Sequence, residues 1–219
     1  MFSRKSTIIA MIFIAFMYLV FVPLVYATTE YKMTDYWPFK EGAWWEFNDG
    51  KIEITGTEKI NEINTFIYVD SGSCSGGGEE LHLVNDDTNG FGFFLQSEDG
   101  SYSLVKLIEP YVKKGDKTTA SFKDTDYREQ TTMVFKLEGT ANVVVPAGTF
   151  KRCLRFSVKL KARHTDGTYS YSTERVYFAK GVGLVKVVSV KQSTEEDCTW
   201  GVGGRDVFNG IRELKDYSN

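Results

Sequence analysis

Tight-turn dipeptides recur along the chain and divide it into segments of strand length. Asp49-Gly50, Asn89-Gly90, Asp99-Gly100 and Asp166-Gly167 each lie beside such segments. Asn-Gly and Asp-Gly pairs favour the positive φ angles that two-residue hairpin turns require. Because hairpins join neighbouring antiparallel strands, this pattern predicts a sheet built from consecutive hairpins.

The segments beside these turns alternate apolar and polar residues, as in Ile52-Glu53-Ile54. A two-residue period is typical of strands with one buried face. After residue 27 the best helical period lies in Val207–Tyr217, which predicts a short C-terminal helix. We therefore expect an all-β fold, an antiparallel meander of about ten strands that forms a bent sheet, half-barrel or barrel.

The longest predicted strand is Phe150–Arg163, with apolar residues on one face and mostly basic residues on the other. At about 3.3 Å per residue it would be about 46 Å long. Such a strand is expected to bend or coil, as in the wall of a barrel. The expected polar face carries Lys151, Cys153, Arg155, Ser157, Lys159, Lys161 and Arg163.

This basic stripe has two interpretations. It could bind a polyanion, such as a cell-wall polymer or an acidic glycan. The candidate contacts are Lys151, Arg155, Lys159 and Lys161. We favour the other interpretation, a solvated strand face whose charges pair with Glu138 or Glu174 on neighbouring strands.

Residues 1–27 combine Arg4 and Lys5, an uncharged apolar run over residues 8–22, and the small residue Ala27. These are the three parts of a secretory signal peptide in their usual order. Cleavage after Ala27 would leave a single all-β domain over residues 28–219. The alternative is an uncleaved membrane anchor, since residues 8–27 are long enough to cross a bilayer. Both readings predict a secreted, periplasmic or cell-surface protein, which contacts the membrane through this segment only if the segment remains uncleaved.

Charge and cysteine content limit the partners and cofactors. Loss of the two cations of the signal would leave 24 basic and 29 acidic residues, a net charge of about -5, which argues against nucleic acid. Three cysteines outside the cytoplasm predict one disulfide and one thiol. We favour Cys74–Cys198, both in polar loop-like segments, over pairs that include Cys153. With no C-x-x-C pair and two histidines, neither a metal site nor a cofactor is expected.

Three segments of the chain resemble exported bacterial proteins of unassigned function. Tyr36–Trp45 (YWPFKEGAWW) is similar to their "Y-P-L-x-x-G-x-x-W" opening. Val143–Cys153 and Tyr177–Val185 (YFAKGVGLV) resemble their "V-P-A-G-T-F…C" and "Y-A-P-G-V-G-L-V" elements, with Lys180 where the group often has proline. The resemblance covers about residues 36–190. It implies an exported or lipid-anchored β-rich protein akin to half-barrel lipoprotein carriers, and it implies no catalytic residues.

The same segments have a direct physical interpretation. Proline cannot donate to a strand ladder and glycine permits reversals, so Pro146–Thr149 and residues 181–183 are expected to form turns. Trp37, Trp44 and Trp45 are expected to hold the N-terminal segment against the sheet.

Evidence for catalysis in the sequence is weak. The loop Asn85–Gly90 spaces oxygen side chains as a calcium loop does, but Gln96 replaces the usual bidentate Glu, so we favour a polar hairpin turn. His82 is expected to point outward from a strand and His164 to end one, and no G-x-S-x-G motif occurs. Paired carboxylates leave a secreted hydrolase as the alternative function.

Aromatic residues make up 15% of the chain, and many lie in predicted strands. We interpret most of them as core, and an apolar pocket inside the barrel as the sharper alternative. The candidate ligand contacts are Phe66, Tyr68, Phe91, Phe93, Tyr169 and Tyr171. The sequence thus predicts an exported, non-catalytic protein of the cell envelope that binds a lipid or another apolar small molecule, or a protein partner.

Overall fold

The computed structural model describes residues 28–71, 80–97, 99–123, 128–192 and 211–218. The expected signal, residues 1–27, and the two cysteines of the favoured disulfide, Cys74 and Cys198, lie outside the described residues. In the part described, no helix is of the length and apolar character needed to cross a bilayer. The only helical element there is one 3-10 turn, η1 (Met33–Asp35). The all-β prediction is confirmed.

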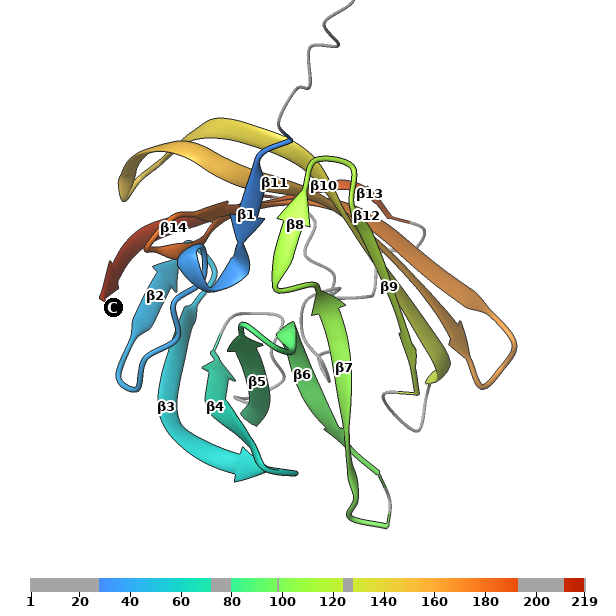
Figure 1. Cartoon of the computed structure of the whole chain (residues 1–219). Coiled ribbons are helices and arrows are strands. Elements are labelled where there is room, and N and C mark those ends of the chain that lie inside the picture. The colour runs from blue at the N-terminus through green and yellow to red at the C-terminus, as the bar shows by residue number, and fades with distance from the viewer. Residues whose placement is uncertain (1–27, 72–79, 98, 124–127, 193–210, 219) are drawn as a thin grey trace, which may run out of the picture.

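Twelve strands form one antiparallel sheet in the order β7-β6-β5-β4-β3-β2-β14-β13-β12-β11-β10-β9, and β1 pairs with β8 in a separate ribbon. The sheet curls into a nearly closed barrel, with its two end strands, β7 and β9, facing each other (Figure 1). The strands are β1 (Glu30–Lys32), β2 (Trp44–Phe47), β3 (Lys51–Ile60), β4 (Ile63–Asp70), β5 (Glu80–Asp86), β6 (Gly90–Gln96), β7 (Tyr102–Ile108), β8 (Tyr111–Lys113), β9 (Lys117–Phe122), β10 (Arg128–Val145), β11 (Gly148–His164), β12 (Tyr169–Ala179), β13 (Gly183–Gln192) and β14 (Ile211–Ser218).

The hairpin turns form where the sequence predicts them. Gly90, Gly100 and Gly167 have φ angles of 74°, 83° and 83°, in the left-handed region that glycine enters without a steric penalty. Residues 146–147 form the tight turn between β10 and β11, where Val145 pairs with Gly148. Because each tight turn joins two neighbouring strands, consecutive strands pair with each other within β2–β7 and within β9–β13.

The predicted C-terminal helix over Val207–Tyr217 is wrong. Ile211–Ser218 is strand β14, which lies between β13 and β2 and pairs antiparallel with both. Arg212 and Leu214 are buried whereas Ile211 is exposed, which is the two-residue alternation of a strand. Two open strand edges on either side supply backbone partners, and this long-range pairing overrides the helical spacing of the apolar residues.

The long strands β10 and β11 bend through bulges. Their pairing shifts between Leu137 and Gly139 and again between Ala141 and Val143, and Arg152 has a φ of 54°. A bulge inserts one residue and reverses the inward–outward alternation beyond it. Cys153 is therefore fully buried, and its predicted place on the basic face is wrong.

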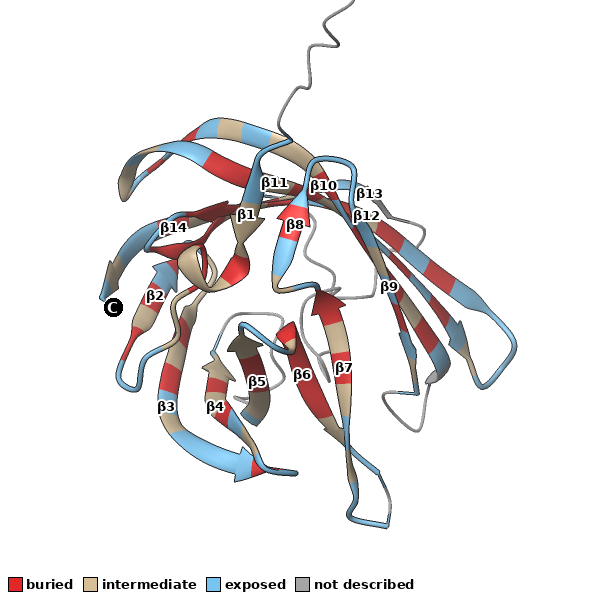
Figure 2. Ribbon diagram, in the orientation of Figure 1, coloured by how far each residue is buried: buried red, intermediate tan, exposed pale blue. Residues whose placement is uncertain are grey.

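The N-terminal segment fills one end of the barrel interior. The ring centroid of Trp37 lies 4.8 Å from that of Phe91 on β6 and 5.0 Å from that of Phe178 on β12. These strands lie on opposite walls, so one indole spans the interior. Phe39 extends the contact to Phe66, at 5.3 Å between centroids. Figure 2 shows the buried residues alternating along the strands, as inward-facing residues must.

Candidate functional site

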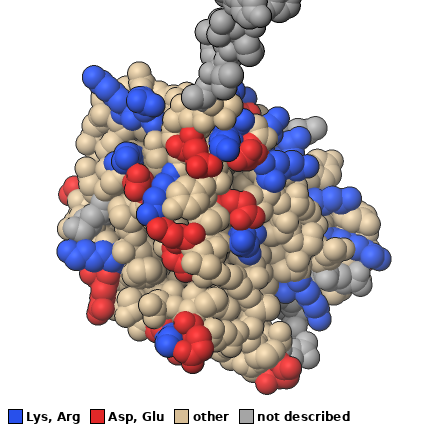
Figure 3. Space-filling view, viewed as in Figure 1, with Lys and Arg blue, Asp and Glu red and all other residues tan. Residues whose placement is uncertain are grey.

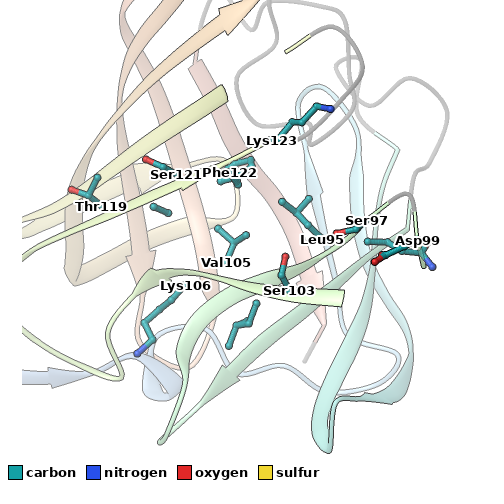
Figure 4. Close-up of a pocket in the computed structure, with 13 residues that line it drawn as sticks. Leu95, Ser97, Asp99, Ser103, Val105, Lys106, Thr119, Ser121, Phe122 and Lys123 are labelled. Carbon is teal, nitrogen blue, oxygen red and sulfur yellow. The ribbon is translucent and has the colours of Figure 1, made fainter. Parts of the chain in front are cut away.

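The boundary between β7 and β9, here called the seam, is the one place where neighbouring walls of the described barrel are not joined by a strand ladder. The ribbon of β1 and β8 lies over one end of the seam (Figure 1). A pocket of about 890 Å³ lies at the other end, lined by residues of β6, β7, β9 and the adjoining turns (Figure 4). We call it the seam pocket.

The seam pocket has an apolar wall contributed by both end strands. Val105 on β7 and Ala120 on β9 are each 8% exposed. The ring of Phe122 meets that of Phe93 edge-on, with centroids 5.3 Å apart, so the pocket borders the core. Leu95 and Leu104 complete the apolar lining. An apolar group that entered here would displace water from these side chains.

Hydroxyl and charged groups form the rest of the lining. The lining residues with hydroxyl side chains are Ser97, Ser103, Thr119 and Ser121, and the Ser121 hydroxyl also lies 3.1 Å from that of Thr132 on β10. Lys106 contributes an ammonium group that also contacts Glu109, 3.1 Å from Nζ to Oε2. The Ser101 hydroxyl and amide donate to Asp99 and lower the pKa of that carboxyl, so Asp99 is committed to its turn. Apolar surface beside several hydroxyls suits an amphipathic molecule better than a purely polar one.

The sequence gives no direct signal for this pocket. Pro110 and Gly115 indicate that β7 and β9 end and begin nearby, but neither indicates that both strands are sheet ends. That property follows from β14, which joins the two halves of the sheet on the other side. The pocket depends on pairings between residues far apart in sequence, which local patterns do not encode.

The six aromatic residues proposed as ligand contacts do not come together in one pocket. Phe91 and Phe93 are buried on β6, and Phe66 packs half-buried against the same core. Tyr68 is buried on β4 beside Asp70. Tyr169 and Tyr171 are 48% and 49% exposed on β12. Among the six, Phe93 lies nearest the seam pocket, through its contact with Phe122.

The basic residues of the long strand keep their predicted outward positions. Lys151, Lys159 and Lys161 are exposed, and Arg155 pairs with Glu138, with 3.0 Å between Nε and Oε2. Glu174, however, is only 1% exposed and lies opposite the buried Val158. The expected pairing of Glu174 with the stripe is wrong because Glu174 faces the barrel interior.

A buried ionic network lies where β14 meets β2, β3 and β4. Arg212 holds the carboxylate of Asp70 with two nearly parallel hydrogen bonds, 2.9 Å from Nη1 and 3.0 Å from Nη2. Its Nε lies 2.9 Å from Asp49 Oδ1, and its guanidinium carbon lies 4.5 Å from the ring centroid of Phe47. Tyr68 donates to Asp70 at 3.3 Å. The network joins the last strand to the first hairpin, and no local pattern in the sequence indicates it.

The electrostatics of this network are those of a structural ion pair. Burial alone would lower the pKa of Arg212, but hydrogen bonding and attraction to Asp70 outweigh it and raise that pKa. Burial raises the pKa of Asp49 despite the nearby guanidinium. Burial likewise raises the pKa of Tyr68 well above its usual value. The two carboxylates are bound by Arg212, so they do not form the acid–base pair that the hydrolase alternative needs.

The other candidates for chemistry are engaged in local structure. Asp86 accepts hydrogen bonds from the backbone amides of Thr88 and Asn89, at 2.7 and 2.6 Å, which makes its loop a hairpin turn. His82 Nδ1 lies 3.4 Å from Glu58 Oε2, and His164 Nε2 lies 3.0 Å from Ser170 Oγ. In the described residues, no cluster of three or more His, Cys, Asp or Glu side chains could hold a metal ion.

Cys153 carries a free, buried thiol. Burial raises its pKa to about 11, so the thiol is protonated at neutral pH and is a poor nucleophile. Its Sγ donates to the carbonyl of Phe150 at 3.5 Å. The cysteine of the "V-P-A-G-T-F…C" element is therefore a packing residue.

The first and third elements of the resemblance lie against each other. Trp45 Nε1 donates to the carbonyl of Val182 at 2.6 Å. A Cβ atom at Gly183 would lie 2.8 Å from Trp37 Cδ1, so only glycine fits beside the two indoles. Lys180, the departure from proline, pairs with Asp35 at 2.9 Å. These contacts confirm the prediction for Trp37 and Trp45, whereas the Trp44 ring lies beneath the Lys51 ammonium, 5.3 Å from it.

Comparisons with known proteins show that the backbone of this chain is similar to those of two solved structures. No protein-family model matches the chain, and no curated protein matches its sequence. A candidate lipoprotein from Parabacteroides distasonis has a similar structure, with a TM-score of 0.49 and 15% identity over 84% of this chain and 98% of that one. A candidate exported protein with a YmcC-like fold from Bacteroides fragilis is also similar, with a TM-score of 0.47 and 12% identity over 84% of this chain and 99% of that one. No residue role is transferred from either protein.

Proposed function

We propose that this protein is exported through residues 1–27 and acts at the cell envelope as a non-catalytic binding protein for an amphipathic molecule with an acyl chain. The observation that carries the proposal is the seam pocket. Its volume of about 890 Å³ lies within the range of about 300–1,000 Å³ that is usual for small-molecule sites. Its apolar wall and hydroxyl groups match the two parts of such a molecule.

The position of the pocket also supports the proposal. Trp37 and its neighbours fill one end of the interior, whereas Val105 and Ala120 face each other across the seam without a strand ladder. A chain inserted here would contact the core through Phe122 and Phe93 without displacing a hydrogen-bonded strand. Each buried methylene would contribute about 0.8 kcal/mol, or roughly fourfold in affinity.

A chain-length series tests the proposal. Octanoate, decanoate and dodecanoate would displace a fluorescent fatty-acid probe from the full chain, and each added pair of methylenes should tighten binding about fifteenfold. Ala120→Trp, which fills the pocket, and Phe122→Ala, which removes its wall, should both weaken binding at least about tenfold. Ser157→Trp on the outside of β11 is the matched control and should bind normally. Affinity independent of chain length, or unchanged in both pocket variants, would refute the proposal.

A protein partner is the second candidate, and the open edges of β7 and β9 favour it. End strands present backbone groups that an added strand can pair with. An extended peptide from a partner would slow hydrogen exchange at the amides of β7 or β9 and would show no dependence on acyl-chain length. This outcome would replace the acyl-chain proposal with strand addition.

A further inference from the structure

The outward side of β9–β12 gathers cations from four adjacent strands. We call this surface the basic face. Its exposed members are Lys117, Lys136, Lys159, Lys161, Arg163 and Arg175. Figure 3 shows lysine and arginine gathered along the flank over these strands, whereas basic and acidic groups intermix on the surface toward the viewer. The concentration is notable in a chain whose net charge is -3.

The strand register arranges these cations in two rows. One row crosses the strands through Lys117, Lys136 and Arg175. Lys117 pairs directly with Lys136, and Ser157 lies between Lys136 and Arg175. The other row runs along β11 through Lys159, Lys161 and Arg163. Lys117 and Lys136 are about 4.8 Å apart across the sheet, Lys136 and Arg175 are about twice that distance apart, and neighbouring members along β11 are about 6.6 Å apart. The charges thus form an extended array.

Few of the described acidic side chains lie among these cations. On the strands β9–β12, the described acidic side chains are those of Glu138 and Glu174. Glu174 faces the interior, and Glu138 already serves both Arg155, at 3.0 Å, and Arg175, at 3.8 Å. Like charges on opposing strands, such as Lys117 and Lys136, destabilise a sheet. An anionic partner would remove this repulsion.

Two exposed tyrosines border the row along β11. Tyr169 pairs with Arg163, and Tyr171 pairs with Lys161. The Lys161 ammonium lies 4.5 Å from the ring centroid of Tyr169. An aromatic face packs against the C–H face of a sugar ring while the neighbouring cations bind its acidic groups. The exposed large apolar side chains of β11 and β12 are these two tyrosines, so these strands present little of the apolar surface that strengthens insertion into a bilayer interface.

We propose that the basic face binds a linear anionic polysaccharide, one whose repeating units carry carboxylate or phosphate groups. A linear chain fits a row of cations along one strand, and its sugar rings fit the bordering tyrosines. This site is separate from the seam pocket and would exist whether or not that pocket holds an acyl chain.

Binding to polygalacturonate, a linear polymer of carboxylated sugars, tests the proposal on the full chain. We expect binding at low ionic strength that weakens as salt is added, and none to uncharged dextran. The double variant Lys159→Glu/Lys161→Glu should lose at least about tenfold in affinity. Tyr171→Ala should lose affinity while keeping the salt dependence, since it removes packing and no charge.

A matched control separates the basic face from overall charge. Lys40→Glu/Lys215→Glu makes the same change in net charge at two exposed lysines outside β9–β12 and should bind within about twofold of the unchanged protein. Equal losses in the two double variants would refute a defined site. Binding to phosphatidylglycerol vesicles without binding to the polymer would replace the polysaccharide with a membrane surface, and binding to neither would also overturn the proposal.

Discussion

Strands β2–β7 form one half of the barrel and strands β9–β13 form the other. The two halves meet at two boundaries that differ in strand pairing and in packing. At the first, β14 pairs with β13 and β2, and the buried Arg212 network ties β14 and the turn after β2 to β4. At the second, the seam, β7 and β9 share no ladder and leave a pocket. A barrel held by strand pairing and buried ion pairs along one boundary, the locked boundary, can keep its shape without a strand ladder at the other.

The largest expected effect is at the locked boundary. Arg212→Met would leave the carboxylates of Asp49 and Asp70 buried without their cation. Removing one partner of a buried ion pair costs about 3–5 kcal/mol, so we expect the free energy of unfolding to fall by that amount in urea denaturation.

The seam supplies the control for this prediction. Lys106→Met removes a cation whose side chain is 38% exposed and which contacts Glu109, and we expect a change within about 0.5 kcal/mol. If both substitutions destabilise the protein equally, the two boundaries do not differ as described.

The next effect concerns the tryptophans beside the locked boundary. Gly183 has a φ of 108°, and an added Cβ would lie 2.8 Å from Trp37 Cδ1. Gly183→Val therefore combines backbone strain with overpacking, and we expect a loss of about 3 kcal/mol. Intrinsic fluorescence would show Trp37 and Trp45 becoming more exposed to water.

The seam again supplies a comparison. Ser103→Val introduces the same β-branched side chain at an exposed position that lines the pocket. We expect it to change the free energy of unfolding by no more than about 0.5 kcal/mol. A normal tryptophan spectrum and unchanged stability in Gly183→Val would show that the N-terminal segment does not depend on this contact.

How far the sequence predicts this structure depends on the range of the interactions involved. Asn89-Gly90 and Pro146 predict their turns because turn chemistry acts within a few residues. Cys153 was placed on the wrong face because the bulge at Arg152 shifts the alternation by one residue. The sequence predicts a helix at the terminal strand β14 because its partner β2 lies near the other end of the chain and its partner β13 is separated from it by residues 193–210.

The candidate sites follow the same rule. The basic stripe was predictable, because Lys159 and Lys161 share one face of a single strand. The row that crosses the sheet through Lys136 and Arg175 required the register of three strands. The seam pocket required knowledge of which strands end the sheet, and the Arg212 network required Asp49 and Asp70, both more than 140 residues away in sequence.

The smallest effect is the pH dependence of a residue in the continuous wall between the two boundaries. The pKa of Cys153 is raised from 9.0 to about 11 by burial, so folding favours its protonated thiol. Its contribution to stability is complete below pH 9 and is lost as the pH rises through 11. At about 1.4 kcal/mol per pKa unit, the loss should approach about 2.7 kcal/mol. Comparing denaturation of the unchanged protein and Cys153→Ala between pH 8 and 11 separates this contribution from those of other groups that titrate there.

Adding Ser121→Cys to Cys153→Ala places a thiol at an exposed position on the seam, where folding does not remove it from water. Between pH 8 and 11 that variant should lose no more stability than Cys153→Ala alone. A loss equal to that of the unchanged protein would mean that a thiol on the seam is as well shielded from water as Cys153.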